Sequence, residues 1–104
     1  MAPALRDLTE LDKLIHEPAR LMIVSILSAV EEADFIYLMH ETGLTRGNLS
    51  SHLSKLEDAG YIKVQKTFRG KVPQTLLRLT GTGQSAFNTY RTQLKQLVTK
   101  ISED

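Results

Sequence analysis

Residues 42–60, TGLTRGNLSSHLSKLEDAG, predict a tight turn followed by a helix with two unlike faces. Leu49, Leu53 and Leu56 recur at i, i+4 and i+7, which is the spacing of a buried helix face. The opposite face carries mostly small polar side chains, which have weak helix propensity and do not form the i, i+4 ion pairs of an ordinary solvated helix. Short polar side chains let a helix approach base edges closely, so this stretch favours insertion into the major groove of DNA.

The composition indicates one globular domain. The chain has 104 residues, of which 41% are hydrophobic and 24% are charged, and this length sustains a single modest core. There is no cysteine, which excludes disulfides, thiolate metal sites and thiol nucleophiles. No apolar run is long enough to span a membrane, and the N-terminal residues lack the apolar core of a signal peptide. We therefore expect no membrane association and a cytoplasmic protein.

The charges are unevenly distributed along the chain, although the net charge is only +1. Residues 1–41 have an excess of acidic side chains, whereas residues 42–78 have an excess of basic ones. A local basic region within a nearly neutral domain is expected of a specific nucleic-acid-binding protein. A solvated surface with no partner is the alternative interpretation.

Apolar spacing predicts several further helices. Pro18 suits the first position of one helix, and Asp34 suits the N-cap of another. Gly43 suits the left-handed position that ends the latter, and Thr45 then caps the polar-faced helix. The further helices are expected over about 5–16, 18–30, 34–43 and 82–101.

The period changes to alternation after Gly60. Ile62 and Val64 fall on one face of a predicted strand, and a second alternating strand ends near residue 79. Between the two strands lies FRGKVP (residues 68–73), in which a glycine is flanked by two cations, as is typical of a hairpin tip. The sequence therefore predicts a two-stranded hairpin over about 61–79.

Helix, helix, turn, helix, hairpin and long helix is the element order of a winged helix. Residues 43–62 closely resemble the recognition helix of small prokaryotic winged-helix regulators of the MarR and ArsR types, and the hairpin and last helix resemble their wing and dimer helix. The resemblance covers about residues 14–90. It implies a single winged-helix DNA-binding domain over residues 1–104, mainly α with a small β-hairpin (α+β). The helix-turn-helix would span about 35–59, the wing about 61–79, and additional terminal dimerisation helices about 5–16 and 82–101.

Docking on duplex DNA would place the start and outer face of the recognition helix in the major groove. Arg46 suits a bidentate contact to guanine and Asn48 a contact to adenine, whereas Thr45 caps the helix and can donate its hydroxyl to a phosphate. The wing cations would reach the minor groove or its phosphates. Capping alone would also explain Thr45, and solubility alone the wing cations. The expected DNA contacts are Thr45, Arg46, Asn48, Ser51, His52, Lys55, Lys66, Arg69 and Lys71.

The apolar stripes of the first and last helices exceed what one small core absorbs. They predict a symmetric homodimer that reads a pseudo-palindrome with half-sites about 10 base pairs apart, or a multiple of that. The alternative is that the terminal helices fold back on their own domain. The expected interface residues are Leu5, Leu8, Leu11, Leu94, Leu97 and Ile101.

The sequence carries no catalytic or metal-binding pattern. The three histidines are dispersed, the Cys-x-Cys pair of ArsR-type metal sensors is absent, and there is no nucleophile–base set or phosphate-binding glycine loop. We therefore expect no enzyme, no metal and no cofactor. The leading hypothesis is a sequence-specific double-stranded DNA-binding transcriptional regulator, acting as a homodimeric repressor. The alternatives are a winged-helix module that binds another protein and a non-specific architectural DNA binder, and no residue set identifies a small-molecule effector.

Overall fold

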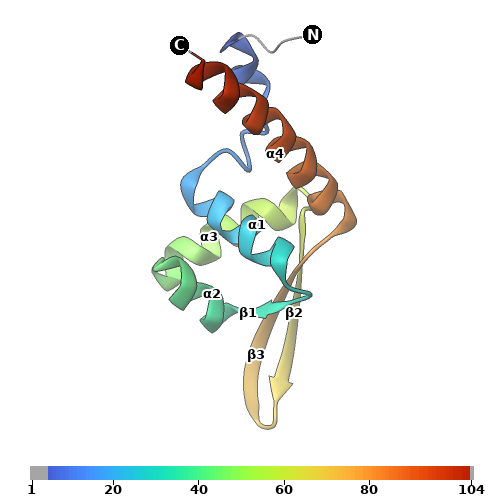
Figure 1. Ribbon diagram of the computed structural model, residues 1–104. Helices are drawn as coiled ribbons and strands as arrows, with labels where there is room; N and C mark the ends of the chain where they lie inside the picture. The colour runs from blue at the N-terminus through green and yellow to red at the C-terminus, as the bar shows by residue number, and fades with distance from the viewer. Residues whose placement is uncertain (1–4, 104) are drawn as a thin grey trace.

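The computed structural model describes residues 5–103 and measures 56 × 25 × 21 Å along its principal axes. A cluster of helices occupies the middle, the hairpin projects from one end, and the C-terminal helix extends toward the other (Figure 1). In order, the elements are the 3-10 helix η1 (Leu5–Glu10), α1 (Pro18–Ala29), β1 (Ala33–Asp34), α2 (Phe35–Thr42), α3 (Arg46–Asp58), β2 (Ile62–Arg69), β3 (Val72–Leu79) and α4 (Gly81–Ser102). Among the described residues, no helix is both long and apolar enough to cross a membrane. The architecture is a winged helix, as expected.

Local caps define the turn between α2 and α3. Asp34 caps α2 by accepting the N–H of Tyr37 at 2.7 Å. Gly43 ends α2 with φ of 71°, a left-handed conformation that glycine adopts without a steric penalty. Thr45 then caps α3, because its Oγ1 accepts the N–H of Asn48 at 3.2 Å. All three caps were predicted from the sequence.

A core of aliphatic and aromatic side chains holds α3 on its inner face. Leu49, Leu53 and Leu56 are buried there, as predicted. Each fully buried leucine contributes about 1.5–3 kcal/mol relative to an exposed one, so the buried stripe fixes which face of α3 points outward. The core residues that join them from other elements include Ile15, Ile23, Val24, Leu27, Leu38, Ile62, Leu77 and Phe87.

The wing belongs to a three-stranded antiparallel sheet of order β1-β3-β2. β2 and β3 pair from Ile62↔Leu79 out to Arg69↔Val72, and Gly70 at the tip has φ of 65°. β1 adds a short third strand through the pair Ala33↔Leu77. The predicted two-stranded hairpin is therefore confirmed, whereas the third strand β1 was not predicted. A strand of two residues is too short to show the alternation by which strands are recognised.

The helix predicted over 5–16 is wrong in its type and extent, because only Leu5–Glu10 is helical, as a 3-10 helix. η1 ends at Glu10, and the chain then continues without regular helix as far as α1. Oδ1 of Asp12 accepts the N–H groups of Leu14 at 2.9 Å and Ile15 at 3.2 Å, so this side chain replaces the bonds that a helical backbone would make. The segment is nevertheless anchored, because Ile15 is fully buried and His16 Nδ1 lies 2.7 Å from the hydroxyl of Tyr90 in α4.

The N-terminal segment packs against α4 of the same chain, which is the fold-back alternative that the sequence left open. Leu11 and Leu97 are buried within this single chain, and Leu94 is partly buried against the core. The expectation that Leu11 and Leu97 offer a surface to a second copy is therefore corrected, because intramolecular packing already covers them. Leu5, Leu8 and Ile101 remain exposed.

Candidate nucleic-acid interface

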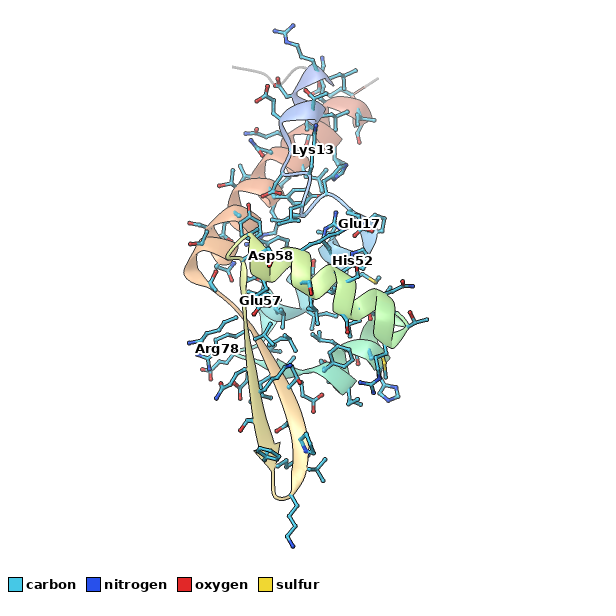
Figure 2. All side chains as sticks on the ribbon, turned by 180° about the vertical axis from the view of Figure 1, so that it is seen from behind. Lys13, Glu17, His52, Glu57, Asp58 and Arg78 are labelled. Atoms are coloured by element: carbon cyan, nitrogen blue, oxygen red, sulfur yellow. The ribbon has the colours of Figure 1, made fainter. Side chains whose placement is uncertain are left out.

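The outer face of α3 is polar and exposed. Arg46, Asn48, Ser51 and Lys55 are all exposed on it, opposite the buried leucines. In Figure 2, α3 crosses the middle of the molecule, and the wing extends below it. The hydroxyl of Thr45 accepts a hydrogen bond as the cap, so its hydrogen is still available for donation to an anion at the helix N-terminus.

A groove of about 840 Å³ lies between α3 and the wing. Arg46 lines it from α3, and Lys66 and Arg69 line it from β2. Asp34 and Glu57 are the carboxylates among its lining residues. The groove therefore brings Arg46 of α3 together with two cations of β2 that follow it by about 20 residues in the sequence, beside the polar face of α3.

Two serines in the groove were missed by the sequence analysis. Ser50 and Ser54 face it from α3, together with Arg46. These three positions repeat at i, i+4 and i+8, a spacing that puts them on one helical stripe. The i, i+4, i+8 spacing of this stripe could be read from the sequence. That the stripe faces a groove could not, because the groove forms only where α3 and the wing meet.

Arg46 also stacks on an aromatic ring. Its guanidinium carbon lies 5.2 Å from the ring centroid of Phe35, at the start of α2. A guanidinium over an aromatic face is attracted by the ring quadrupole. Phe35 thereby helps to hold Arg46 at the mouth of the groove, a contact between two helices that sequence spacing could not reveal.

The cations of the wing are exposed and not neutralised. Among residues 5–103, ion pairs form elsewhere, and none involves Lys66, Arg69 or Lys71. Arg78, near the base of the hairpin, is different because it pairs with Glu32 at 3.3 Å. The positive charge of the distal wing is thus available to an external anion.

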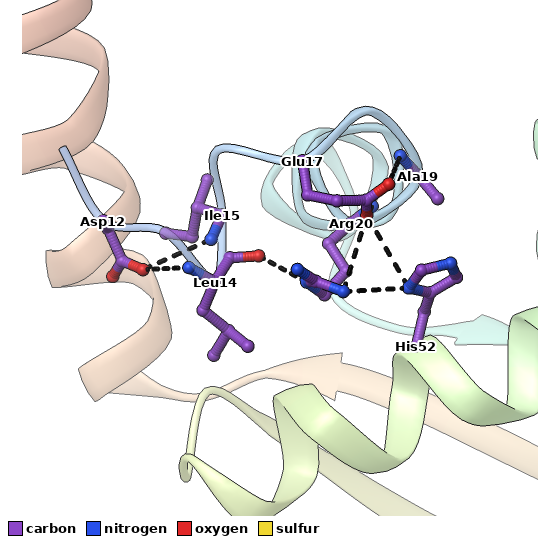
Figure 3. Close-up of polar contacts among 7 residues, drawn as sticks. All are labelled: Asp12, Leu14, Ile15, Glu17, Ala19, Arg20 and His52. Carbon is purple, nitrogen blue, oxygen red and sulfur yellow. Dashed lines mark hydrogen bonds and ion pairs between the residues drawn. The ribbon is translucent and has the colours of Figure 1, made fainter. Parts of the chain in front are cut away.

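His52 lies on the side of α3 that faces α1, rather than in the middle of the exposed face (Figure 2). Its Nδ1 is 3.1 Å from Nη1 of Arg20 and 3.6 Å from Oε2 of Glu17 (Figure 3). The His52 side chain is only 21% exposed. His52 therefore lies at the edge of the polar face of α3, in a polar cluster with Glu17 and Arg20.

Glu17 organises the α1 side of that cluster as the N-cap of α1. Its carboxylate accepts the N–H groups of Ala19 at 3.0 Å and Arg20 at 2.9 Å. Burial raises the pKa of Glu17, but these hydrogen bonds and the electrostatic effect of the neighbouring His52 and Arg20 side chains outweigh it, so the pKa lies below its ordinary value. Pro18 at the start of α1 was predicted from the sequence, whereas Glu17 as the N-cap of this helix was not.

A second polar contact connects the base of the wing to the N-terminal segment. Tyr61 donates its hydroxyl to Oδ2 of Asp12 at 2.5 Å. This hydrogen bond, together with burial and the charge of Asp12, raises the pKa of Tyr61 to about 12. Asp12 therefore connects the wing base to the segment that packs on α4. No group of three side chains suited to a metal occurs among the described residues.

Comparison with known proteins extends these observations. The family model for the winged helix DNA-binding domain matches residues 19–98. A protein of Methanocaldococcus jannaschii, uncharacterized protein MJ0432, is 34% identical over 90 residues, which are 86% of this chain and 97% of that protein. The structure of a transcriptional regulator homologue from Pyrococcus horikoshii OT3 matches with a TM-score of 0.85 at 28% identity, covering 92% of this chain and 97% of that one.

More distant solved structures share the fold. A MarR-family regulator from Silicibacter pomeroyi has a TM-score of 0.61 at 17% identity, covering 94% of this chain and 61% of its own. An ArsR-family regulator has a TM-score of 0.61 at 20% identity, and the match covers 93% of this chain and 95% of that regulator. The resemblance to the MarR and ArsR types is thus confirmed at the level of fold. Because the family match spans most of the sequence and includes both α3 and the wing, the chain belongs to the winged helix DNA-binding domain family.

Proposed function

We propose that this chain is a sequence-specific regulator of transcription that reads double-stranded DNA with α3 and the wing. The observation that carries the proposal is the meeting of Arg46, Lys66 and Arg69 at one groove beside the exposed polar face of α3. Phosphates supply the anions that such cations bind, and the short polar side chains on the exposed face of α3 are suited to base edges. The proposal is of a binding protein and not of an enzyme, and DNA as its partner implies a cytoplasmic location.

Each residue has a distinct role in this proposal. Arg46 and Asn48 read base edges in the major groove, where guanine and adenine offer bidentate partners. Ser51 and Lys55 contact base edges and phosphates further along α3, and the Thr45 hydroxyl binds a phosphate at its start. Lys66 neutralises the DNA strand that crosses the groove, whereas Arg69 and Lys71 reach the minor groove.

We further propose that two copies assemble symmetrically and repress by occupying promoter DNA. Leu5, Leu8, Val98 and Ile101 are exposed apolar side chains on η1 and α4, the elements that lie together at the end opposite the wing. Their burial against a second copy would remove apolar surface from water. A dimer of this kind would read two half-sites about 10 base pairs apart, or a multiple of that.

The proposal is tested by selection from a pool of random duplex DNA at near-physiological salt, followed by sequencing. The expected result is an enriched palindrome. Retention without an enriched motif would instead indicate architectural binding, and no retention would indicate a protein partner. Either of these two results would overturn the proposal.

Two matched arginine variants then test whether Arg46 recognises a base. Arg46→Ala should lose about 1–3 kcal/mol of discrimination at one base position. Arg91→Ala is the control, because Arg91 also lies over a phenylalanine ring, that of Phe87 at 4.9 Å, but on α4. Equal effects of the two variants on base discrimination would contradict the role of Arg46.

A further inference from the structure

We propose that Arg20 fixes the tautomer of His52 and thereby presents the Nε2–H of its imidazole to DNA as a hydrogen-bond donor. This inference rests on the proposed function and extends it to α1, which lies outside both expected DNA-contacting elements. Arg20 would be a positioning residue that acts through His52 and makes no DNA contact of its own.

Arg20 is held firmly enough for this role (Figure 3). Its Nε donates to the carbonyl oxygen of Leu14 at 2.5 Å, and its Nη1 lies 3.6 Å from Oε2 of Glu17. Its side chain is only 11% exposed. The guanidinium is thus oriented by Leu14 and Glu17, which both precede Arg20 in the chain, while its Nη1 contacts Nδ1 of His52.

The donor and acceptor chemistry of the pair determines the tautomer. A guanidinium has donors and no acceptor and stays charged. At 3.1 Å from Nη1, the Nδ1 of His52 must therefore accept, and the hydrogen of a neutral ring lies on Nε2. A hydrogen on Nδ1 could be donated to the carboxylate of Glu17, which is 3.6 Å away, but it would point at the N–H donor of Arg20. The shorter contact to the permanently charged group favours Nε2–H.

Within residues 5–103, Nε2 of His52 is left without a hydrogen-bond partner. None of the hydrogen bonds formed among residues 5–103 uses Nε2 of His52, although Nδ1 is engaged. The ring is partly exposed and lies between α1 and the polar face of α3. Acceptors on DNA that match it are a phosphate oxygen and the base-edge atoms of the major groove.

A fixed tautomer matters because a free imidazole places its hydrogen on either nitrogen, and the ring of an unrestrained side chain also rotates. Fixing the ring through a neighbouring group reduces the ordering that binding would otherwise require. The same logic governs metal-binding histidines, whose second nitrogen is held by a neighbouring hydrogen bond. Arg20 supplies this restraint from α1.

The tautomer is tested directly by NMR of ¹⁵N-histidine-labelled protein at about pH 8, where an unperturbed imidazole is neutral. The His52 signals are assigned by their loss in His52→Gln. The expected result is an unprotonated Nδ1 and a protonated Nε2 in the wild type, and a mixture of tautomers in Arg20→Met. A hydrogen on Nδ1 of the wild type would overturn the inference.

A double-mutant cycle on the DNA selected above tests the coupling. His52→Ala should weaken binding about tenfold, which is the loss of one specific hydrogen bond. Arg20→Met should weaken it less, and the double variant no more than His52→Ala alone. His52→Gln should retain most of the affinity, because its amide oxygen can accept from Arg20 while its N–H groups donate to DNA.

The outcomes separate this inference from the function on which it rests. If the wild type binds no duplex, both are overturned; if it binds specifically and His52→Ala binds equally well, this inference alone is overturned. Additive losses for Arg20→Met and His52→Ala would show that Arg20 does not act through His52. Loss of discrimination at one base pair identifies a base-edge acceptor, whereas uniform weakening across sequences identifies a phosphate. Thermal unfolding of each variant, with Arg91→Met as the matched control, separates misfolding from lost contacts.

Discussion

The two surfaces proposed to contact DNA are supported in opposite ways. α3 packs on buried leucines, begins at a side-chain cap and is held along one side by α1. The distal wing is supported mainly by pairing of its own two strands, and Phe68 and Val72 near its tip are 68% and 65% exposed. A region with few buried contacts opens and moves at low free-energy cost. We therefore expect α3 to be held rigidly and the wing tip to change its position at low free-energy cost.

The largest effect is expected from deleting a side chain beneath α3. Leu49→Ala should lower the free energy of unfolding by about 2–5 kcal/mol, because it opens a cavity under a fully buried leucine. Val72→Ala removes an exposed apolar side chain from the wing and should change the free energy of unfolding by less than about 0.5 kcal/mol. Urea denaturation measures both variants. Similar losses in the two would contradict the contrast between a supported and an unsupported surface.

The next effect concerns the junction between α4 and the base of the wing. A Cβ on Gly83 would lie 2.1 Å from the carbonyl oxygen of Tyr61. Gly83→Ala must therefore displace α4 or the wing base, and we expect a loss of about 1–3 kcal/mol in thermal unfolding measurements. Unchanged stability would mean that this junction relaxes freely and that the wing is adaptable down to its base.

Gly47→Ala is the matched glycine control on α3, because a Cβ there meets nothing within 4 Å. Alanine favours helix over glycine by about 0.5–1 kcal/mol, so this variant should be more stable than the wild type. If DNA affinity falls at the same time, the glycine serves close approach to DNA and not helix stability.

A pH-dependent effect is expected from Tyr61. Its pKa is raised to about 12, so the folded state favours the neutral hydroxyl, which donates to Asp12. The stabilisation is present below the unfolded pKa of about 10 and is lost as the pH rises from there to about 12. Chemical denaturation across this range should show a steeper loss of stability for the wild type than for Tyr61→Phe. Parallel curves would contradict the prediction.

The smallest effect on folding is expected at the wing. Arg69→Ala should leave the unfolding free energy nearly unchanged, because Arg69 is exposed and forms no ion pair with any other residue of the described range 5–103. The logarithm of the DNA-binding constant falls linearly with the logarithm of the salt concentration. Arg69→Ala should make this slope shallower by about the amount that one phosphate contact contributes. Arg78→Ala should alter the slope less, because Arg78 is paired with Glu32. Binding titrations over a salt series compare the two, and a larger change for Arg78→Ala would contradict the assignment.

The site was only partly predictable from the sequence. The polar face of α3 and the cations of the wing could be identified one element at a time, because each depends on residues within a few positions of one another. The groove between them could not, since it requires α3 and the hairpin to be placed relative to each other. His52 was grouped with the polar face by spacing, whereas its contact to Arg20 joins residues 32 positions apart.

The sequence by itself determined the local structure around α2 and α3. Asp34, Gly43 and Thr45 specify where these helices begin and end through contacts with their immediate neighbours, and the leucine stripe specifies the buried face. Three other features depend on the assembled tertiary structure. They are the short strand β1, the irregular path after η1 and the orientation of His52. These features depend on hydrogen bonds and packing between distant segments, such as His16 with Tyr90 across 74 positions. Short-range sequence patterns contain no information about such pairings, because the paired residues come into contact only when the core assembles.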